Sequence, residues 1–396
     1  MENRKLKFSP TLAAVLLSAF MLASCSALRF SQVPESQNGW PMFGRDASHN
    51  SVVKKSSVLL QRAWEFNAGA GFGDFSPIIE GGRVFIGTLN GNVVTLNVEN
   101  GKEEGGKMFG GAIFSPPLLF GDMLVIASSQ SKYNLLGYDL STGKVKWEKR
   151  ITDVESAPAS FDRSVYLATL GGDIYRIDPL TGKEIFHEHY DAPFRTSPAL
   201  FDSICVLGCD NGYVYAISPA DGKPLWKYDA GSPVWCSASI SDSLIFVGTV
   251  AGKLVVLKMN GELSFELPNQ LTRVDTTGDG ALHYFGGDNI LSMPITDGKM
   301  VYFGCNDGNF YAVNLVDSTV IWKDSTDGPI VAPPIQTQDQ IIFGSFDENL
   351  YVVNKLDGKI EQKIDLRGRV RTSPAVYRDF LVVCAESSKV IGFKIR

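Results

Sequence analysis

A phrase of about forty residues recurs along the chain, and this repeat constrains the fold more than any other feature. Each copy begins with a short segment of the "TSPA" type. Its anchor position falls on Pro77, Pro117, Pro158, Pro198, Ala238, Pro294, Pro334 and Pro374. Successive anchors are 40, 41, 40, 40, 56, 40 and 40 residues apart. Seven copies are complete, and the eighth stops 22 residues after Pro374.

Each copy has the pattern of a small antiparallel sheet. An apolar run such as "VFIG" or "IIFG" follows the anchor, then a turn such as "LNGN" or "NDGN", then a second run such as "YVYAI". Short β-rich runs separated by Asn-Gly or Asp-Gly turns predict hairpins. Four strands in about forty residues are typical of a propeller blade, which cannot bury both faces alone. The sequence therefore predicts an all-β chain, an eight-bladed β-propeller with four-stranded antiparallel blades.

The truncated eighth copy lacks its fourth strand, and a matching segment stands before the first anchor. Trp64 precedes Pro77 by 13 residues, much as Trp226 precedes Ala238 by 12. We expect residues 60–67 to pair with the C-terminal strands, so that an N-terminal strand completes the last blade and Trp64 closes the ring. Residues 58–396 then form the propeller.

The first residues have the pattern of an export signal. Basic residues precede an apolar run of about eleven residues, which is short for the roughly twenty that a spanning helix needs. The following "LASC" resembles the lipobox of bacterial lipoproteins, which implies cleavage after residue 24 and lipidation of Cys25. A plain secretory signal remains an alternative. Residues 25–57 then form a tether and lead-in segment.

The repeats resemble a known family. "DLSTGKVKW", "DPLTGKEIF" and "SPADGKPLW" are similar to the repeat of PQQ-like eight-bladed propellers, in which the tryptophan docks between blades. The lead-in "WPMFGRDASHNS" also resembles that of many bacterial members. Lipobox, length and blade count favour the branch of BamB-like outer-membrane assembly lipoproteins over the longer quinoprotein dehydrogenases. The inter-blade partner residues of that branch have no clean counterparts here, since "DLRG" and "VDTT" lie at other places in the ring.

The resemblance implies a non-enzymatic scaffold or binding platform. It would be lipid-anchored on the periplasmic side of the outer membrane and bind outer-membrane assembly proteins or other envelope proteins, as a monomer within a complex. Two alternatives stay open: a PQQ-dependent oxidoreductase, and a surface protein that binds a ligand or polysaccharide. The net charge of −6 gives no indication of a nucleic-acid surface.

Residue types that carry catalysis or bind cofactors are sparse. The chain has no adjacent cysteine pair of the kind that quinoprotein dehydrogenases place over PQQ, so we expect no PQQ, no catalytic residue and no metal. His187 and His189 share one strand face but lack an evident third ligand. The five cysteines after Cys25 occupy columns filled elsewhere by small or apolar residues. We expect buried thiols, although an odd count in an oxidising compartment leaves a disulfide possible.

The position three residues before each anchor varies from copy to copy, although the rest of the phrase is regular. It reads Asp74, Phe114, Glu155, Arg195, Trp235, Leu291, Val331 and Arg371. These residues should surround the central opening, with Arg195 and Arg371 on opposite sides. Aromatic residues beside charge suit a partner or ligand surface. The candidate contacts are Phe194, Arg195, Trp235 and Arg371, with Arg273 and Asp275 from the extra loop 267–290.

Overall fold

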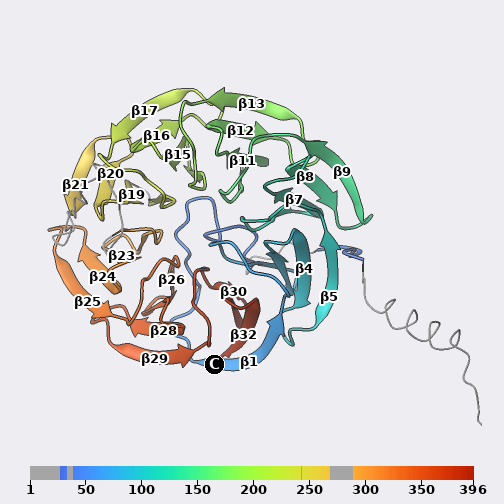
Figure 1. Cartoon of the computed structure of the whole chain (residues 1–396). Coiled ribbons are helices and arrows are strands. Elements are labelled where there is room, and N and C mark those ends of the chain that lie inside the picture. Colours follow the sequence, from blue (N-terminus) through green and yellow to red (C-terminus); the bar gives the residue numbers. More distant parts are fainter. Residues whose placement is uncertain (1–26, 34–38, 242, 268–288) are drawn as a thin grey trace, which may run out of the picture.

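The computed structural model describes residues 27–33, 39–241, 243–267 and 289–396. In this part of the chain, 32 strands form eight four-stranded antiparallel sheets, which stand around a central axis as a closed ring (Figure 1). The predicted eight-bladed β-propeller is confirmed. The same residues contain no helix with the length and apolar character needed to cross a membrane.

The first four blades follow the predicted repeat. Blade 1 contains β2 (Ile78–Glu80), β3 (Arg83–Gly87), β4 (Asn92–Asn97) and β5 (Glu103–Met108). Blade 2 contains β6 (Leu118–Phe120), β7 (Met123–Ala127), β8 (Leu135–Asp139) and β9 (Lys144–Lys149). Blade 3 contains β10 (Ala159–Phe161), β11 (Ser164–Ala168), β12 (Asp173–Ile177) and β13 (Glu184–His189). Blade 4 contains β14 (Ala199–Phe201), β15 (Ile204–Gly208), β16 (Tyr213–Ile217) and β17 (Pro224–Asp229).

The remaining blades have the same order from the axis outward. Blade 5 contains β18 (Ser239–Ile240), β19 (Leu244–Gly248), β20 (Leu254–Lys258) and β21 (Leu263–Leu267). Blade 6 contains β22 (Ile295–Thr296), β23 (Met300–Gly304), β24 (Asn309–Asn314) and β25 (Val320–Ser325). Blade 7 contains β26 (Ile335–Gln336), β27 (Gln340–Gly344), β28 (Asn349–Asn354) and β29 (Ile360–Asp365). Blade 8 contains β30 (Ala375–Tyr377), β31 (Phe380–Ala385), β32 (Lys389–Ile395) and β1 (Leu60–Asn67).

Blade 8 confirms the predicted closure of the ring. Strand β1 pairs antiparallel with β32 from Leu60 opposite Ile395 to Asn67 opposite Lys389, with one bulge between Arg62 and Trp64. The ends of the propeller segment therefore meet in one sheet, where the two colour extremes of Figure 1 lie side by side. The ring is therefore continuous, and the free strand edges of the blades lie on its outside, at the outermost strands.

Residues 39–58 cross the centre of the ring, where Figure 1 shows the blue lead-in among the innermost strands. The backbone of this lead-in forms hydrogen bonds with strands of five blades. Trp40 and Ile79 bond in both directions, and the other bonds run from amide to carbonyl: Leu119 to Pro41, Leu200 to Ala47, Ile240 to Ser48 and Val53 to Gln336. The innermost strands would otherwise leave backbone groups unpaired along the axis. The lead-in thus acts as an internal plug as well as a connection to the N-terminal segment.

Candidate functional site

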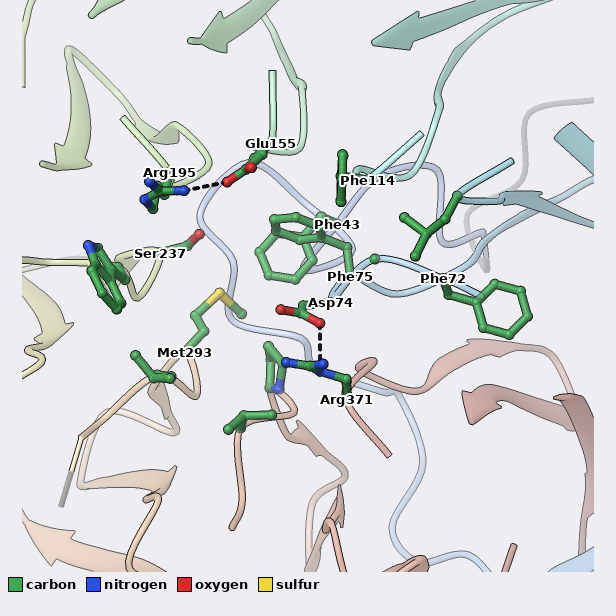
Figure 2. Close-up of a pocket in the computed structure, with 16 residues that line it drawn as sticks. Phe43, Phe72, Asp74, Phe75, Phe114, Glu155, Arg195, Ser237, Met293 and Arg371 are labelled. Atoms are coloured by element: carbon green, nitrogen blue, oxygen red, sulfur yellow. Dashed lines mark hydrogen bonds and ion pairs between the residues drawn. The ribbon is translucent and has the colours of Figure 1, made fainter. Parts of the chain in front are cut away.

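The residues of the variable column come together around one opening on the axis. All eight, from Asp74 to Arg371, line a cup of about 550 Å³. They meet because each stands where an outermost strand returns to the innermost strand of the next blade. Arg195 and Arg371 lie on opposite sides of this cup (Figure 2), as their positions in blades 4 and 8 predict. The placement of the column is therefore confirmed.

The floor of the cup is formed by a residue from the lead-in. Phe43 is 2% exposed and packs edge-to-face against Phe75, with 4.9 Å between the ring centroids. On its other side it meets the ring of His49 at 5.2 Å. Figure 2 shows Phe43 and Phe75 in the middle of the opening. The floor of the cup is thus closed and apolar.

The backbone at the cup wall needs a residue without a side chain. A Cβ at Gly73 would lie 1.7 Å from the carbonyl oxygen of Phe114, at the mouth of the next blade. Only glycine allows the two mouths to approach this closely. The contact brings Asp74 and Phe75 inward, next to Phe114.

Arg195 is held by carboxylates of the ring. Its Nη1 lies 2.6 Å from Oε2 of Glu155, and its Nε lies 3.2 Å from Oδ2 of Asp210. Its guanidinium also lies 5.9 Å from the centre of the Trp235 ring, which is 42% exposed. The arginine charge is therefore compensated within the ring, and Trp235 offers the larger free contact area.

Arg371 forms a second cluster across the cup. Its Nε lies 2.9 Å from Oδ1 of Asp74, and its guanidinium lies 5.3 Å from the centre of the Phe346 ring. Desolvation by the cup walls raises the pKa of Asp74; Arg371 opposes this shift and Glu386 adds to it. Although 61% of the Asp74 side chain is exposed, that exposure is to the inside of a concave site. The four ionisable side chains that line the cup, two arginines and two acids, have a net formal charge of zero.

Comparison with known proteins identifies the family of this ring. A family model described as "Outer membrane protein assembly factor BamB" (PQQ_2) matches residues 61–204, 148–279 and 210–396. The chain belongs to this PQQ_2 family. The family assignment predicted from the repeat is thereby confirmed, and the matches span all eight blades.

Solved structures similar to this PQQ_2 chain include a BamB and several dehydrogenases. BamB from Moraxella catarrhalis has 16% identity and a TM-score of 0.69, covering 85% of this chain and 100% of its own. A europium-containing methanol dehydrogenase has 12% identity and a TM-score of 0.73, covering 88% and 90%. The quinohemoprotein alcohol dehydrogenase from Comamonas testosteroni has 13% identity and a TM-score of 0.73, covering 97% and 84%. At these identities the likeness shows the fold alone. No curated protein matches the chain.

Not every predicted contact residue reaches the surface of this PQQ_2 propeller. Phe194 is fully buried and packs edge-to-face on Tyr190 and Tyr215, so the expectation that it offers a partner contact is wrong. It immediately precedes Arg195, and successive side chains of an extended backbone point in opposite directions. Arg273 and Asp275 lie outside the described residues, and so does Cys25.

The remaining histidines and cysteines have structural contacts. His187 Nε2 and His189 Nδ1 lie 3.0 and 2.9 Å from the same oxygen, Oδ1 of Asp173. No group of three potential ligands in the described residues is arranged to hold a metal. The cysteines are buried thiols, as expected, and burial raises the pKa of Cys236 to about 12. The five are Cys205, Cys209, Cys236, Cys305 and Cys384.

Several lining residues were missed by reasoning from the repeat. Phe75 stands next to the variable column and could have been found there, since it precedes a serine and the anchor Pro77. Phe72 and Met293 also line the cup, and they stand five residues before Pro77 and one residue before Pro294. Phe43 had no such signal, because the lead-in does not repeat. Its place at the floor depends on long-range pairing with five blades.

Proposed function

We propose that this PQQ_2 propeller is a non-enzymatic, lipid-anchored docking platform on the periplasmic side of the outer membrane, used in outer-membrane protein assembly. The observation that carries the proposal is the family match, which covers the ring from residue 61 to residue 396. Cys25 would carry the acyl chains. The cup around the axis would receive apolar side chains of an assembly protein or of an incoming unfolded chain.

The geometry of the cup supports docking of an apolar segment. Phe114, Trp235, Leu291 and Val331 give it an apolar lining, and both arginines are compensated by acids of the ring. Buried aromatic anchors contribute most of the binding energy at protein interfaces, whereas compensated ion pairs at a rim mainly fix orientation. The closed floor limits insertion to side chains or a loop and prevents threading through the axis.

The similarity to quinoprotein dehydrogenases makes an oxidoreductase the second candidate. In that case the cup residues would have to fit PQQ. The quinone carries three carboxylates and needs uncompensated cations around it. Arg195 and Arg371 already contact Glu155, Asp210 and Asp74. The described residues also lack a cluster suited to calcium. The cup residues therefore do not fit the cofactor, which favours the docking platform.

Affinity capture from membranes tests the platform. Trp235→Glu with Leu291→Glu places two charges in the cup, whereas Leu225→Glu with Ile321→Glu places them on exposed outer strands as a matched control. Leu225 and Ile321 are 51% and 50% exposed. We expect the wild type and the control to capture outer-membrane assembly proteins and the cup variant to lose them. Equal capture by both variants would exclude the cup as the docking site.

Two further outcomes would contradict the role itself. Wild-type protein that captures no assembly protein would refute a place in outer-membrane assembly. Dye reduction by the protein after incubation with PQQ and Ca²⁺, together with a new absorption band, would refute the non-enzymatic assignment. The Trp235→Glu and Leu291→Glu variant serves as the control there, because a cofactor in the cup would be lost with it.

A further inference from the structure

The N-terminal segment is packed against blades 1 and 2 before it reaches the lead-in. Ala27 forms a bridge with Gly106 of β5, and the amide of Phe30 donates to the carbonyl of Leu140. Leu28 is fully buried, and the Tyr138 hydroxyl donates to its carbonyl. This segment lies at the outer side of the ring between β5 and β9 (Figure 1). These contacts fix the position of residues 27–30 on the ring.

This packing limits the distance between Cys25 and the ring. Arg29 is four residue steps after Cys25, and an extended chain spans at most about 3.6 Å per step, or about 14 Å in total. The Arg29 Nε donates to the carbonyl of Ser141 at 3.0 Å, just before β9 begins. Acyl chains on Cys25 would therefore hold Arg29, which is bonded to the turn before β9, within about 14 Å of their attachment point.

The same place is cationic in a protein that is acidic overall. Strand β9, KVKWEK, has three lysines and one glutamate, a net charge of +2. The other seven outermost strands range from −2 to 0, with histidines counted as neutral. The exported chain is more acidic than the −6 of the full sequence, because the segment before Cys25 is basic. The positive strand thus stands beside the point where the lipid would be attached.

A groove of about 690 Å³ lies next to the start of β9. Lys146 and Arg163 contribute cations to it, Asp122 and Asp139 contribute acids, and Leu180 contributes an apolar side chain that is 55% exposed. We define the blade-2 foot, named after β9, as Arg29, Lys144 and Lys146 together with Arg163 and Leu180 from the adjacent turns of blade 3. Lys146 is paired with Asp139 at 3.1 Å. Lys144 and Arg163 are exposed and form no ion pair within the described residues.

We propose that the blade-2 foot lies against the membrane and binds the headgroups of anionic phospholipids. This inference rests on the lipid anchor of the proposed function. An acyl anchor with an adjacent basic patch gives two-signal membrane binding, in which the cations select anionic lipids. Leu180 would lie at the headgroup boundary. The ring would be held against the membrane by this side and would not rotate freely about its anchor.

Blades 7 and 8 offer matched controls on the other side of the ring. Leu356 occupies the turn position of Leu180 and is 84% exposed. Lys359 follows the turn glycine as Lys144 does, and Arg378 lies in the same kind of turn as Arg163. A fluorophore on Leu180→Cys or Leu356→Cys can be compared in lipidated protein, because the cysteines of the ring are buried. The vesicles contain phosphatidylcholine with or without phosphatidylglycerol, and a nitroxide on the headgroup serves as quencher.

We expect the label at position 180 to be quenched at least about threefold more than the label at 356 in vesicles with phosphatidylglycerol. Lys144→Glu with Arg163→Glu should abolish this difference, and Lys359→Glu with Arg378→Glu should retain it. Equal quenching at both sites, or quenching that does not depend on the lipid charge or on the foot variant, would overturn the proposal. Protein that carries no acyl groups by mass spectrometry would refute the anchor itself, which is a separate and distinguishable failure.

Discussion

Replacement of Trp64 by alanine tests how the ring is closed. The indole is 8% exposed, and its Nε1–H donates to the carbonyl of Val98 in blade 1 at 2.8 Å. It lies over Gly101 and Gly392, where a Cβ would come within 2.5 and 2.0 Å of its ring atoms. The tryptophan thus fastens blade 8 to blade 1 through its hydrogen bond to Val98 and its close fit over Gly101, while Gly392 makes room for the ring within blade 8. Trp64→Ala removes all of these contacts.

The expected loss of stability follows from the burial of the indole and from the Val98 carbonyl, which loses its hydrogen-bond donor. Truncation of a buried tryptophan costs about 3–5 kcal/mol, which includes the cavity left behind. An unfolding entropy of about 2.1 cal/mol/K per residue converts 4 kcal/mol into a fall in Tm of about 5 °C for a chain of this size. Trp322→Ala is the matched variant, since Trp322 is 9% exposed and donates to the Lys355 carbonyl at 2.9 Å over Gly358. We expect both variants to lose a similar amount of stability.

Hydrogen exchange separates the two variants. Strand β25, which carries Trp322, is joined to β24 by a tight turn, whereas β1 is held to β32 only by hydrogen bonds and packing. Loss of Trp64 should therefore let β1 detach locally, without global unfolding. We expect faster amide exchange in β1 and β32 of Trp64→Ala and no such local increase in β25 of Trp322→Ala. Slow exchange in β1 of the Trp64→Ala protein would refute the role of this residue in closure.

Three other perturbations address the plug and the cup. Phe43→Ala should lower the unfolding free energy by about 3–4 kcal/mol and deepen the cup; binding of an apolar dye should increase, and unchanged dye binding would contradict the assigned floor. Burial lowers the pKa of His49, so its contribution to stability should be full above about pH 6.5 and decline as the pH falls. His49→Asn should therefore flatten the dependence of the unfolding free energy on pH between about pH 7 and pH 5. An unchanged dependence would refute this. Arg371→Gln should raise the pKa of Asp74 further, measurable by NMR titration of the carboxyl carbon, and an unshifted titration would contradict the pairing.

The ring and its closure by β1 could be predicted because they depend on local patterns. A period of about forty residues with Asn-Gly turns determines the blade, and the count of copies determines the ring. The missing fourth strand was recognisable from Trp64, which precedes its anchor by nearly the spacing found for Trp226. The predicted closing strand, residues 60–67, is confirmed with the same bounds as β1 (Leu60–Asn67).

The cup could be predicted only in part, because its details depend on contacts between blades. The variable column identified the lining, since every copy turns at the same point. Besides an acid of its own blade, each arginine meets one from a neighbouring blade, as with Arg195 and Glu155 or Arg371 and Asp74. The repeat brings the two positions of each pair side by side in adjacent blades, but it does not give them opposite charges, and it does not place Phe43 of the lead-in beneath them. Phe194 was misassigned because side-chain direction alternates along the backbone.

The two proposed surfaces are related by strand direction. In a four-stranded antiparallel blade, the turns between the first and second strands and between the third and fourth strands lie at one face, and the return to the next blade lies at the other. Arg163 and Leu180 lie in turns at the first of these faces. The cup lies at the other face, where the chain passes from one blade to the next. A ring held at the blade-2 foot would thus open its cup away from the nearest membrane. The lead-in closes the axis between these faces, so that headgroups cannot reach the surface offered to a periplasmic partner.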